Sequence, residues 1–171
     1  MEQALDLIFK RRSVRIFSKK TVSKEAITSI LKAAMAAPSA SNSRPWEFIA
    51  ITDPDTLEKL RKSLKYGKYN ATAAIVVCAN LELAQNESAM RFWVQDCSAA
   101  TENILIAAAG LGLGTVWIGS YPKEDVMQTE REILGIPENV TPLSLVYIGH
   151  PAEEPQPRTQ YEEERVHWEK Y

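Results

Sequence analysis

Basic residues gather near the N-terminus of the chain, with no acidic residue among them. The run consists of Lys10, Arg11, Arg12, Arg15, Lys19, Lys20 and Lys24. Residues 11–15 follow a predicted helix end and are predicted to be extended, so that residues 11, 13 and 15 project to one side and Arg12 to the other. Two guanidinium groups and the Ser13 hydroxyl on one side have the chemistry that binds a phosphate. A solvated basic face is the other interpretation of the same run.

A polar loop is predicted from Pro38 to Trp46, between a helix and a strand. Its small hydroxyl residues and Asn42 could offer side-chain and backbone hydrogen bonds to a ligand, and binding residues are frequent on loops between rigid elements. An ordinary connecting loop would have the same composition. The loop therefore favours a ligand-binding role only in combination with other features.

Other patterns of catalytic chemistry find no support in the sequence. Residues 110–114 are rich in glycine, but they lack the lysine and Ser/Thr of a P-loop and precede a strand, where a Rossmann glycine motif would follow one. His150 and His167 stand apart from any Cys, Asp or Glu at metal-ligand spacing. The sequence has no Gly-x-Ser-x-Gly motif, and Cys97 lies on an apolar helix face typical of a core. We expect neither a metal site nor a hydrolase.

Helices and strands alternate along the chain and would position these segments. Helices are predicted over residues 3–10, from Ser23 to Pro38, after Asp53-Pro54, over 89–111 and over 123–134. Strands are predicted over residues 46–52, 73–79, 115–118 and 143–149. The apolar run 73–79 is typical of a strand buried on both faces. The alternation predicts an α/β or α+β sandwich, with a central sheet covered by helices.

Length and composition bound the class of protein. The 171 residues suit one domain, and 45% hydrophobic and 25% charged residues are typical of a globular chain. A net charge of −2 argues against a general nucleic-acid binder. Residues 103–121 carry no formal charge, but their glycines favour a buried helix followed by a strand over a membrane span. With two cysteines and no secretory signal, we expect a cytoplasmic protein without nucleic-acid or membrane partners.

Four segments, taken in order, carry a family resemblance: RRSVRIF, PSASNSRPWEF, GLGLGTVWIG and GHP. Over residues 3–151 the chain resembles the flavin-dependent nitroreductase family, and its length resembles the compact branch of that family. The resemblance implies an α+β fold, a three-layer sandwich in which helices cover a central mixed sheet. It also implies a homodimer with one FMN in each of two sites at the subunit interface.

The resemblance assigns cofactor-binding residues to three segments. The basic segment would hold the FMN phosphate and ribityl chain, the polar loop would reach the flavin from the other subunit, and the third would face flavin N5 and O4 with its backbone. Position by position these are Arg11, Arg12, Ser13 and Arg15; Pro38, Ser39, Ala40 and Asn42; and Ile118 and Gly119, with Arg158 as a late residue that returns to the phosphate. Two positions depart from the family pattern: Arg44 replaces a common glutamine, and Gln160 replaces a late basic residue.

The function that the resemblance implies is an FMN-dependent oxidoreductase in which the flavin carries the chemistry and no side chain is catalytic. NAD(P)H would deliver hydride to flavin N5, leave, and be replaced by a nitroaromatic, quinone or flavin acceptor in a ping-pong mechanism, with Arg15 stabilising the reduced flavin. The alternative is a non-catalytic FMN-binding protein that retains the fold. A relative acting on iodinated aromatics would need a substrate-covering segment, and residues 81–90 are short for one.

Residues 152–171 form a tail outside the predicted FMN-binding domain, which spans residues 1–151. The tail is rich in Pro and Glu but carries Tyr161, Val166, Trp168 and Tyr171. A solvated tail has little use for aromatic side chains. We therefore expect it to pack either on its own domain or on the partner subunit.

Overall fold

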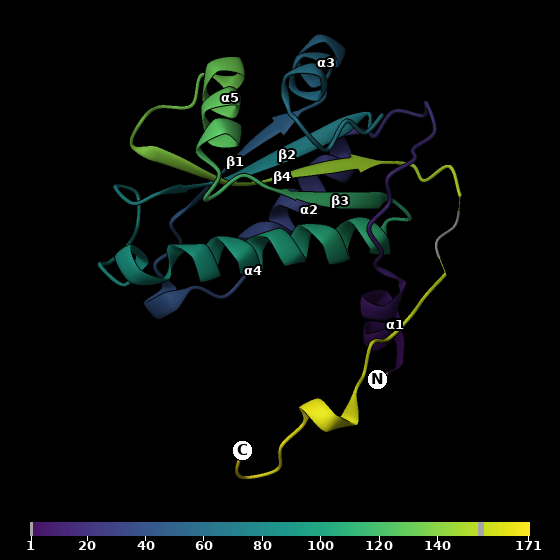
Figure 1. Ribbon diagram of the computed structural model, residues 1–171, viewed down its shortest axis with the longest axis vertical. Coiled ribbons are helices and arrows are strands. Elements are labelled where there is room, and N and C mark those ends of the chain that lie inside the picture. The colour runs from purple at the N-terminus through teal and green to yellow at the C-terminus, as the bar shows by residue number, and fades with distance from the viewer. Residues whose placement is uncertain (1, 154–155) are drawn as a thin grey trace.

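A four-stranded sheet lies between two layers of helices (Figure 1). The structure, a computed structural model, describes residues 2–153 and 156–171. Across the sheet the strands stand in the order β1 (Trp46–Ile51), β2 (Ala73–Asn80), β4 (Val140–Gly149) and β3 (Gly114–Gly119). β1 and β3 are therefore the edge strands.

Two pairs of helices cover the two faces of the sheet. One face carries α3 (Pro54–Ser63) and α5 (Glu124–Leu134), and the other carries α2 (Lys24–Met35) and α4 (Ala89–Gly110) (Figure 1). The remaining helices are α1 (Glu2–Lys10), beside the C-terminal end of α4, and two 3-10 helices at Ala40–Asn42 and Glu163–Arg165. The three-layer α+β sandwich predicted from the sequence is confirmed.

The pairing of the strands corrects one part of that prediction. All three neighbouring pairs in the sheet are antiparallel, whereas the family resemblance implies a mixed sheet. Among the described residues, parallel pairing is confined to a bridge between Ser13 and Thr115 on the outer edge of β3. The N-terminal segment supplies this parallel neighbour, but it then crosses the end of the sheet, where Phe17 bridges Pro151.

The helix ends are set by local chemistry that the sequence carries. The Ser23 hydroxyl accepts a hydrogen bond from the Ala26 N–H at 3.2 Å and caps α2. Asp53 caps α3 in the same way, because its carboxylate accepts from the Thr56 N–H at 2.8 Å. Gly135 ends α5 in the left-handed conformation, with φ 68°. The predicted helix positions are confirmed to within one or two residues at these ends.

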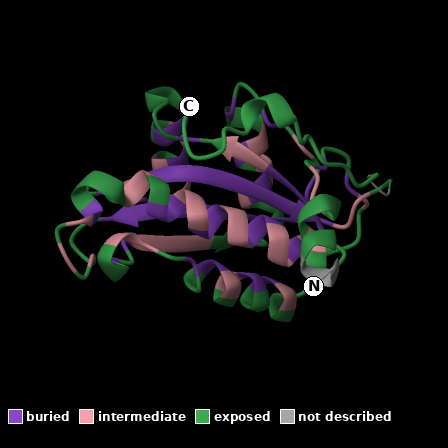
Figure 2. Cartoon of the chain, turned by 90° about the horizontal axis from the view of Figure 1, so that it is seen from below, coloured by how far each residue is buried: buried purple, intermediate pink, exposed green. Residues whose placement is uncertain are grey.

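The core forms one cluster of apolar side chains on each face of the sheet. Every residue of β2 is buried, so both faces of this strand contact a helical layer (Figure 2). On α4, Cys97 and Ile104 are fully buried against the sheet, as the helical spacing predicts. Burial raises the pKa of the Cys97 thiol to about 12, so this cysteine is a core residue and not a nucleophile.

A pair of glycines holds the basic N-terminal segment close to the sheet. Gly114 and Gly149 are paired across β3 and β4, and the side chains of Val14 and Phe17 pack directly over them. The Val14 N–H also donates to the carbonyl of Thr115 at 2.8 Å. Because Gly114 and Gly149 have no Cβ, the side chains of Val14 and Phe17 fit closely against the sheet and hold the segment of residues 11–18 there.

We predict that Gly114→Ala displaces this segment. A Cβ at Gly114 would lie 2.7 Å from the Cβ of Val14, closer than real side chains approach. Overpacking of this kind costs about 1–3 kcal/mol of unfolding free energy. Thermal unfolding should show the loss, whereas Gly110→Ala should show none, because its new methyl would meet Leu7 at an ordinary 3.8 Å. Equal stabilities for the two variants would contradict the close packing.

Candidate functional site

A pocket of about 710 Å³ opens between α1, the C-terminal end of α4 and the start of β3. Three consecutive basic residues, Lys10, Arg11 and Arg12, line one side of it. Gly112 to Thr115 line the other side, and Gln156 and Pro157 from the tail close the rim. The combination of cationic side chains with glycine-rich backbone suits an anionic ligand.

Arg11 is held in place by an acidic residue of α4. Its Nε lies 3.4 Å from Oε1 of Glu102, and both side chains are partly exposed. Burial raises the pKa of Glu102, and the positive charge of Arg11 opposes that rise. Glu102 thus orients the Arg11 guanidinium at the pocket. A bound anion would compete with the Glu102 carboxylate for this guanidinium.

Arg12 lies on the same pocket as Arg11, which corrects the expectation that the two project to opposite sides. The reason is that the Arg11 N–H still donates to the carbonyl of Leu7, so the extended segment begins only after Arg11. The Arg12 guanidinium donates to the Gln156 carbonyl. Ser13 and Arg15 are exposed beside the pocket and do not line it.

The tail passes over the pocket where the resemblance placed Arg158. The Arg158 N–H donates to the Phe9 carbonyl at the end of α1, at 3.2 Å. Its side chain is exposed, as is that of Gln160. The backbone of Arg158 is thus held beside the basic segment, and a contact between its side chain and a phosphate stays a prediction.

The far end of β3 presents an open backbone edge. Thr115 directs its carbonyl to the outer edge, where it accepts from Val14, and peptide groups two residues apart on a strand point the same way. The backbone of Gly119 therefore faces this open edge. Gly119 is exposed, and a Cβ there would meet no atom within 4 Å. The Ile118 side chain instead packs against Gly67 and the core beneath α3 and α5.

The polar loop that contains Pro38 and Ser39 is fixed by a buried carboxylate that sequence analysis missed. Asp96 on α4 accepts from the Ala40 N–H and from the Ser43 hydroxyl, both at 2.8 Å. Around this anchor the backbone turns tightly, with left-handed φ values at Ser41, Asn42 and Arg44. The side chains of Pro38, Asn42 and Arg44 remain exposed. A loop held this firmly keeps its outer groups in position for a ligand.

One chain does not bring the polar loop and the basic pocket together. The loop is attached to α4 at Asp96, and the pocket lies at the other end of that helix, at Gly110. At about 1.5 Å per residue, roughly 21 Å of helix separates them. The predicted site residues therefore form two groups in the chain: the basic pocket with its β3 edge, and the polar loop.

A buried carboxyl group lies directly behind the open edge. Glu130 on α5 is fully buried, and its Oε1 accepts a hydrogen bond from the Ser120 hydroxyl at 2.8 Å. Its Oε2 has no hydrogen-bond partner among the described residues. Burial raises the pKa of Glu130 to about 7, and the Ser120 hydrogen bond acts against that rise.

This pKa predicts a stability that falls as the pH rises. The folded protein holds the Glu130 proton more tightly than the unfolded chain, so the unfolding free energy decreases from about pH 4.5 to about pH 7 and then levels off. The difference between 4.5 and about 7 amounts to about 3 kcal/mol. Urea denaturation between pH 5 and 8 should show that Glu130→Gln removes this decrease. Glu138→Gln, a change at an exposed position, should keep it.

Residues 2–153 and 156–171 hold neither a metal-binding cluster nor a membrane-spanning helix. No group of three or more His, Cys, Asp or Glu side chains there could hold a metal ion. None of the helices in this part of the chain is long and apolar enough to cross a membrane.

Comparison with known proteins decides the family. A model of the nitroreductase family matches residues 8–67 and 62–150. The chain is also 48% identical to a protein of Archaeoglobus fulgidus named as an NADH dehydrogenase/NAD(P)H nitroreductase, over the full length of both chains. The chain belongs to the nitroreductase family. The resemblance stated from the sequence motifs is thereby confirmed.

Solved structures agree with the family and the fold. A protein of Bacteroides thetaiotaomicron, named as an NADH dehydrogenase/NAD(P)H nitroreductase, is 42% identical and superposes with a TM-score of 0.91, covering 99% of this chain and 98% of that one. A nitroreductase of Desulfovibrio desulfuricans in complex with FMN is 28% identical, with a TM-score of 0.80 and coverage of 98% and 97%. This chain therefore shares its nitroreductase fold with a protein that binds FMN.

Proposed function

We propose that the protein is an FMN-dependent oxidoreductase that passes electrons from NAD(P)H to small acceptors. The observation that carries the proposal is the pairing, on one strand, of a cationic pocket at the start of β3 with an open backbone edge at Gly119. This arrangement suits a ligand with an anionic group at one end and a flat polar ring at the other. Relatives named as NAD(P)H nitroreductases support the same chemistry.

The residues present fit FMN. Arg11 and Arg12 would bind the phosphate, and the exposed Ser13 and Arg15 would follow the ribityl chain out of the pocket. At the far end of β3, the backbone of Gly119 would bind the polar edge of the flavin ring. The bound flavin supplies hydride acceptance and donation, and the protein supplies binding, orientation and charge. The preorganised cations beside the site stabilise negative charge that develops on a bound ligand.

We further propose a homodimer in which the polar loop of one subunit completes the site of the other. Within one chain the loop and the pocket lie at opposite ends of α4. A second copy would bring Ser39 and Asn42 against the flavin ring, which the described part of one chain leaves uncovered. The chain is thus expected to hold two equivalent sites per dimer.

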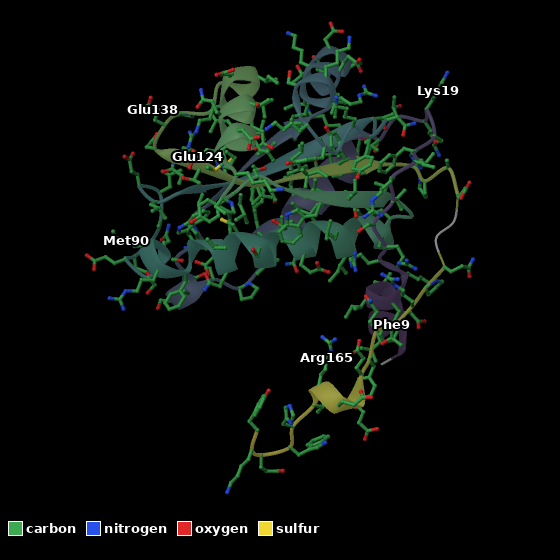
Figure 3. The ribbon with its side chains drawn as sticks, viewed as in Figure 1. Phe9, Lys19, Met90, Glu124, Glu138 and Arg165 are labelled. Atoms are coloured by element: carbon green, nitrogen blue, oxygen red, sulfur yellow. The ribbon has the colours of Figure 1, made fainter. Side chains whose placement is uncertain are left out.

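Exposed apolar side chains also favour this dimer. On α1 the side chains of Leu5, Ile8 and Phe9 are exposed, although they form the apolar face of that helix. Beyond Arg158, whose N–H donates to the Phe9 carbonyl, the tail extends away from the sheet (Figure 3), and its Trp168 is 79% exposed. Both segments are drawn as exposed near the labelled chain ends in Figure 2. Apolar surface of this extent is typical of a protein–protein contact, so we assign α1 and the tail to the partner subunit.

Purified protein tests the proposal directly. We expect yellow protein whose flavin absorbance is bleached by NADH or NADPH in the absence of oxygen and restored by a nitroaromatic, a quinone or free flavin. Light scattering should give twice 19.2 kDa. FMN retention without bleaching would instead support a non-catalytic FMN-binding protein. A stable 19.2 kDa species that retains FMN would contradict the shared site.

A further inference from the structure

Two buried residues, Ser120 and Glu130, hold the turn that follows β3. Ser120 is fully buried, although the preceding residue, Gly119, is exposed. The N–H groups of Ser120 and Tyr121 both donate to the carbonyl of Leu143, at 3.0 and 3.1 Å. Backbone hydrogen bonds thus hold the turn to β4, and they leave the Ser120 hydroxyl free to bond elsewhere.

That hydroxyl bonds to Glu130, which lies on the buried face of α5. The residues one turn before it on α5, Val126 and Met127, are buried apolar side chains. A buried carboxyl with one unpartnered oxygen lowers stability, whereas a leucine of similar size would not. Among the described residues, the Glu130 side chain forms a hydrogen bond only with Ser120, which lies beside the open edge.

We propose that Glu130 is a positioning residue for the bound flavin: through the Ser120 hydroxyl it fixes the backbone of the adjacent Gly119 at the open edge where the cofactor ring would bind. This inference rests on the proposed function. A peptide group that must meet a flat ring has to be held to a fraction of an ångström, since small displacements of a reacting group cost rate. The side-chain bond adds a third attachment to the two backbone bonds of the turn.

The proton on Glu130 should change the strength of this attachment. A hydrogen bond to an ionised carboxylate is stronger than one to a neutral acid. The Glu130 charge acts on two titratable groups, the Tyr147 hydroxyl on β4 and the Cys78 thiol on β2, and burial raises the pKa of each to about 12. The charges of Glu47 on β1 and Arg131 on α5 also act on Cys78. The Arg61 guanidinium on α3 also acts on Tyr147. Glu130 is therefore the group of this cluster whose charge changes near neutral pH.

Three variants of the full-length protein separate positioning from general stability. Glu130→Leu and Ser120→Ala remove the attachment, and Glu130→Gln keeps an acceptor oxygen without the charge. We expect the first two to slow reduction of bound FMN by NAD(P)H about 10-fold or more in stopped-flow measurements. Their FMN dissociation constants should stay within about 2-fold, because the phosphate pocket lies at the other end of β3.

The pH profile and hydrogen exchange supply readouts that a merely structural role would not move. The wild-type reduction rate should change across pH 7, and Glu130→Gln should restore most of the rate but flatten the profile. In flavin-free protein, the amides of residues 119–121 should exchange faster in Glu130→Leu and Ser120→Ala than in wild type. Glu138→Gln, at an exposed position, should match wild type in every measurement.

Two outcomes would overturn the assignment. In the first, wild type and the Glu130 and Ser120 variants reduce FMN and exchange amides at equal rates. In the second, the variants lose FMN affinity and reduction rate in the same proportion, as a general loss of folding would produce. Wild-type protein that never takes up FMN would overturn the proposed function as well, so the two failures are distinguishable.

Discussion

Replacing Arg11 by alanine should weaken FMN binding roughly 10- to 150-fold. A hydrogen bond between the guanidinium and a phosphate of about −2 charge contributes about 1.5–3 kcal/mol, and each 1.4 kcal/mol is about tenfold in affinity. Arg11 lines the pocket and is already oriented by Glu102 at 3.4 Å. Riboflavin lacks the phosphate, so its affinity should hardly change. Fluorescence titration of both flavins into the flavin-free protein measures the two constants.

The ion pair between Arg11 and Glu102 predicts that a change at Glu102 has the opposite effect on FMN binding. Glu102→Gln should tighten FMN binding, because the carboxylate that competes for Arg11 is then neutral. Lys59→Ala is the matched control for Arg11→Ala, since it removes one positive charge from an exposed position on α3 and should leave the affinity for FMN unchanged. Equal losses of riboflavin and FMN affinity in Arg11→Ala would show that the basic run is a solvated face and not a phosphate site.

Most of the fold could be predicted from the sequence because local patterns determine it. The caps at Ser23 and Asp53, the stop at Gly135 and the apolar run of β2 all lie where the sequence places them. The antiparallel sheet could not be predicted from such patterns. Strand direction depends on how the connecting helices cross the sheet, and residue spacing within a strand carries no record of it.

The candidate site was predicted in its segments but not in the contacts that hold them. The extended pattern places Arg12 opposite Arg11 because it takes the extended segment to begin at Arg11, whereas the Arg11 N–H still donates to the Leu7 carbonyl just beyond the last residue of α1. Asp96 and Glu130 were missed, although each interrupts an apolar helix stripe: Asp96 adjoins Cys97, and Glu130 follows Met127 by three residues. A charged residue on such a stripe is the signal that could have found both. The hydrogen-bond partners of the two carboxylates cannot be predicted in this way, because the tertiary fold alone brings Ala40 to Asp96 and Ser120 to Glu130.

Replacing Gly119 by valine should slow the reduction of bound FMN by about 100-fold or more without unfolding the protein. The backbone at Gly119 is not left-handed and a Cβ there meets no atom of the chain within 4 Å, so the fold accepts the side chain. A branched side chain on the open edge would, however, keep a ligand away from the backbone groups. Loss of one preorganised hydrogen-bond donor costs about 10²–10³ in rate. Stopped-flow reduction by NAD(P)H, with thermal unfolding alongside, measures both quantities.

Ile118→Val is the matched control for this prediction, because it changes the neighbouring side chain and not the open edge. Ile118 Cδ1 packs beside Gly67 in the core, so removing one methyl group should cost about 0.5–1.5 kcal/mol of stability. The reduction rate should stay close to wild type, since the backbone at Gly119 is untouched. If both variants lost rate equally, residues 118–119 would be core residues with no role at the flavin. If Gly119→Val alone lost rate and kept its stability, the open end of β3 would be the place where the ring of the cofactor binds.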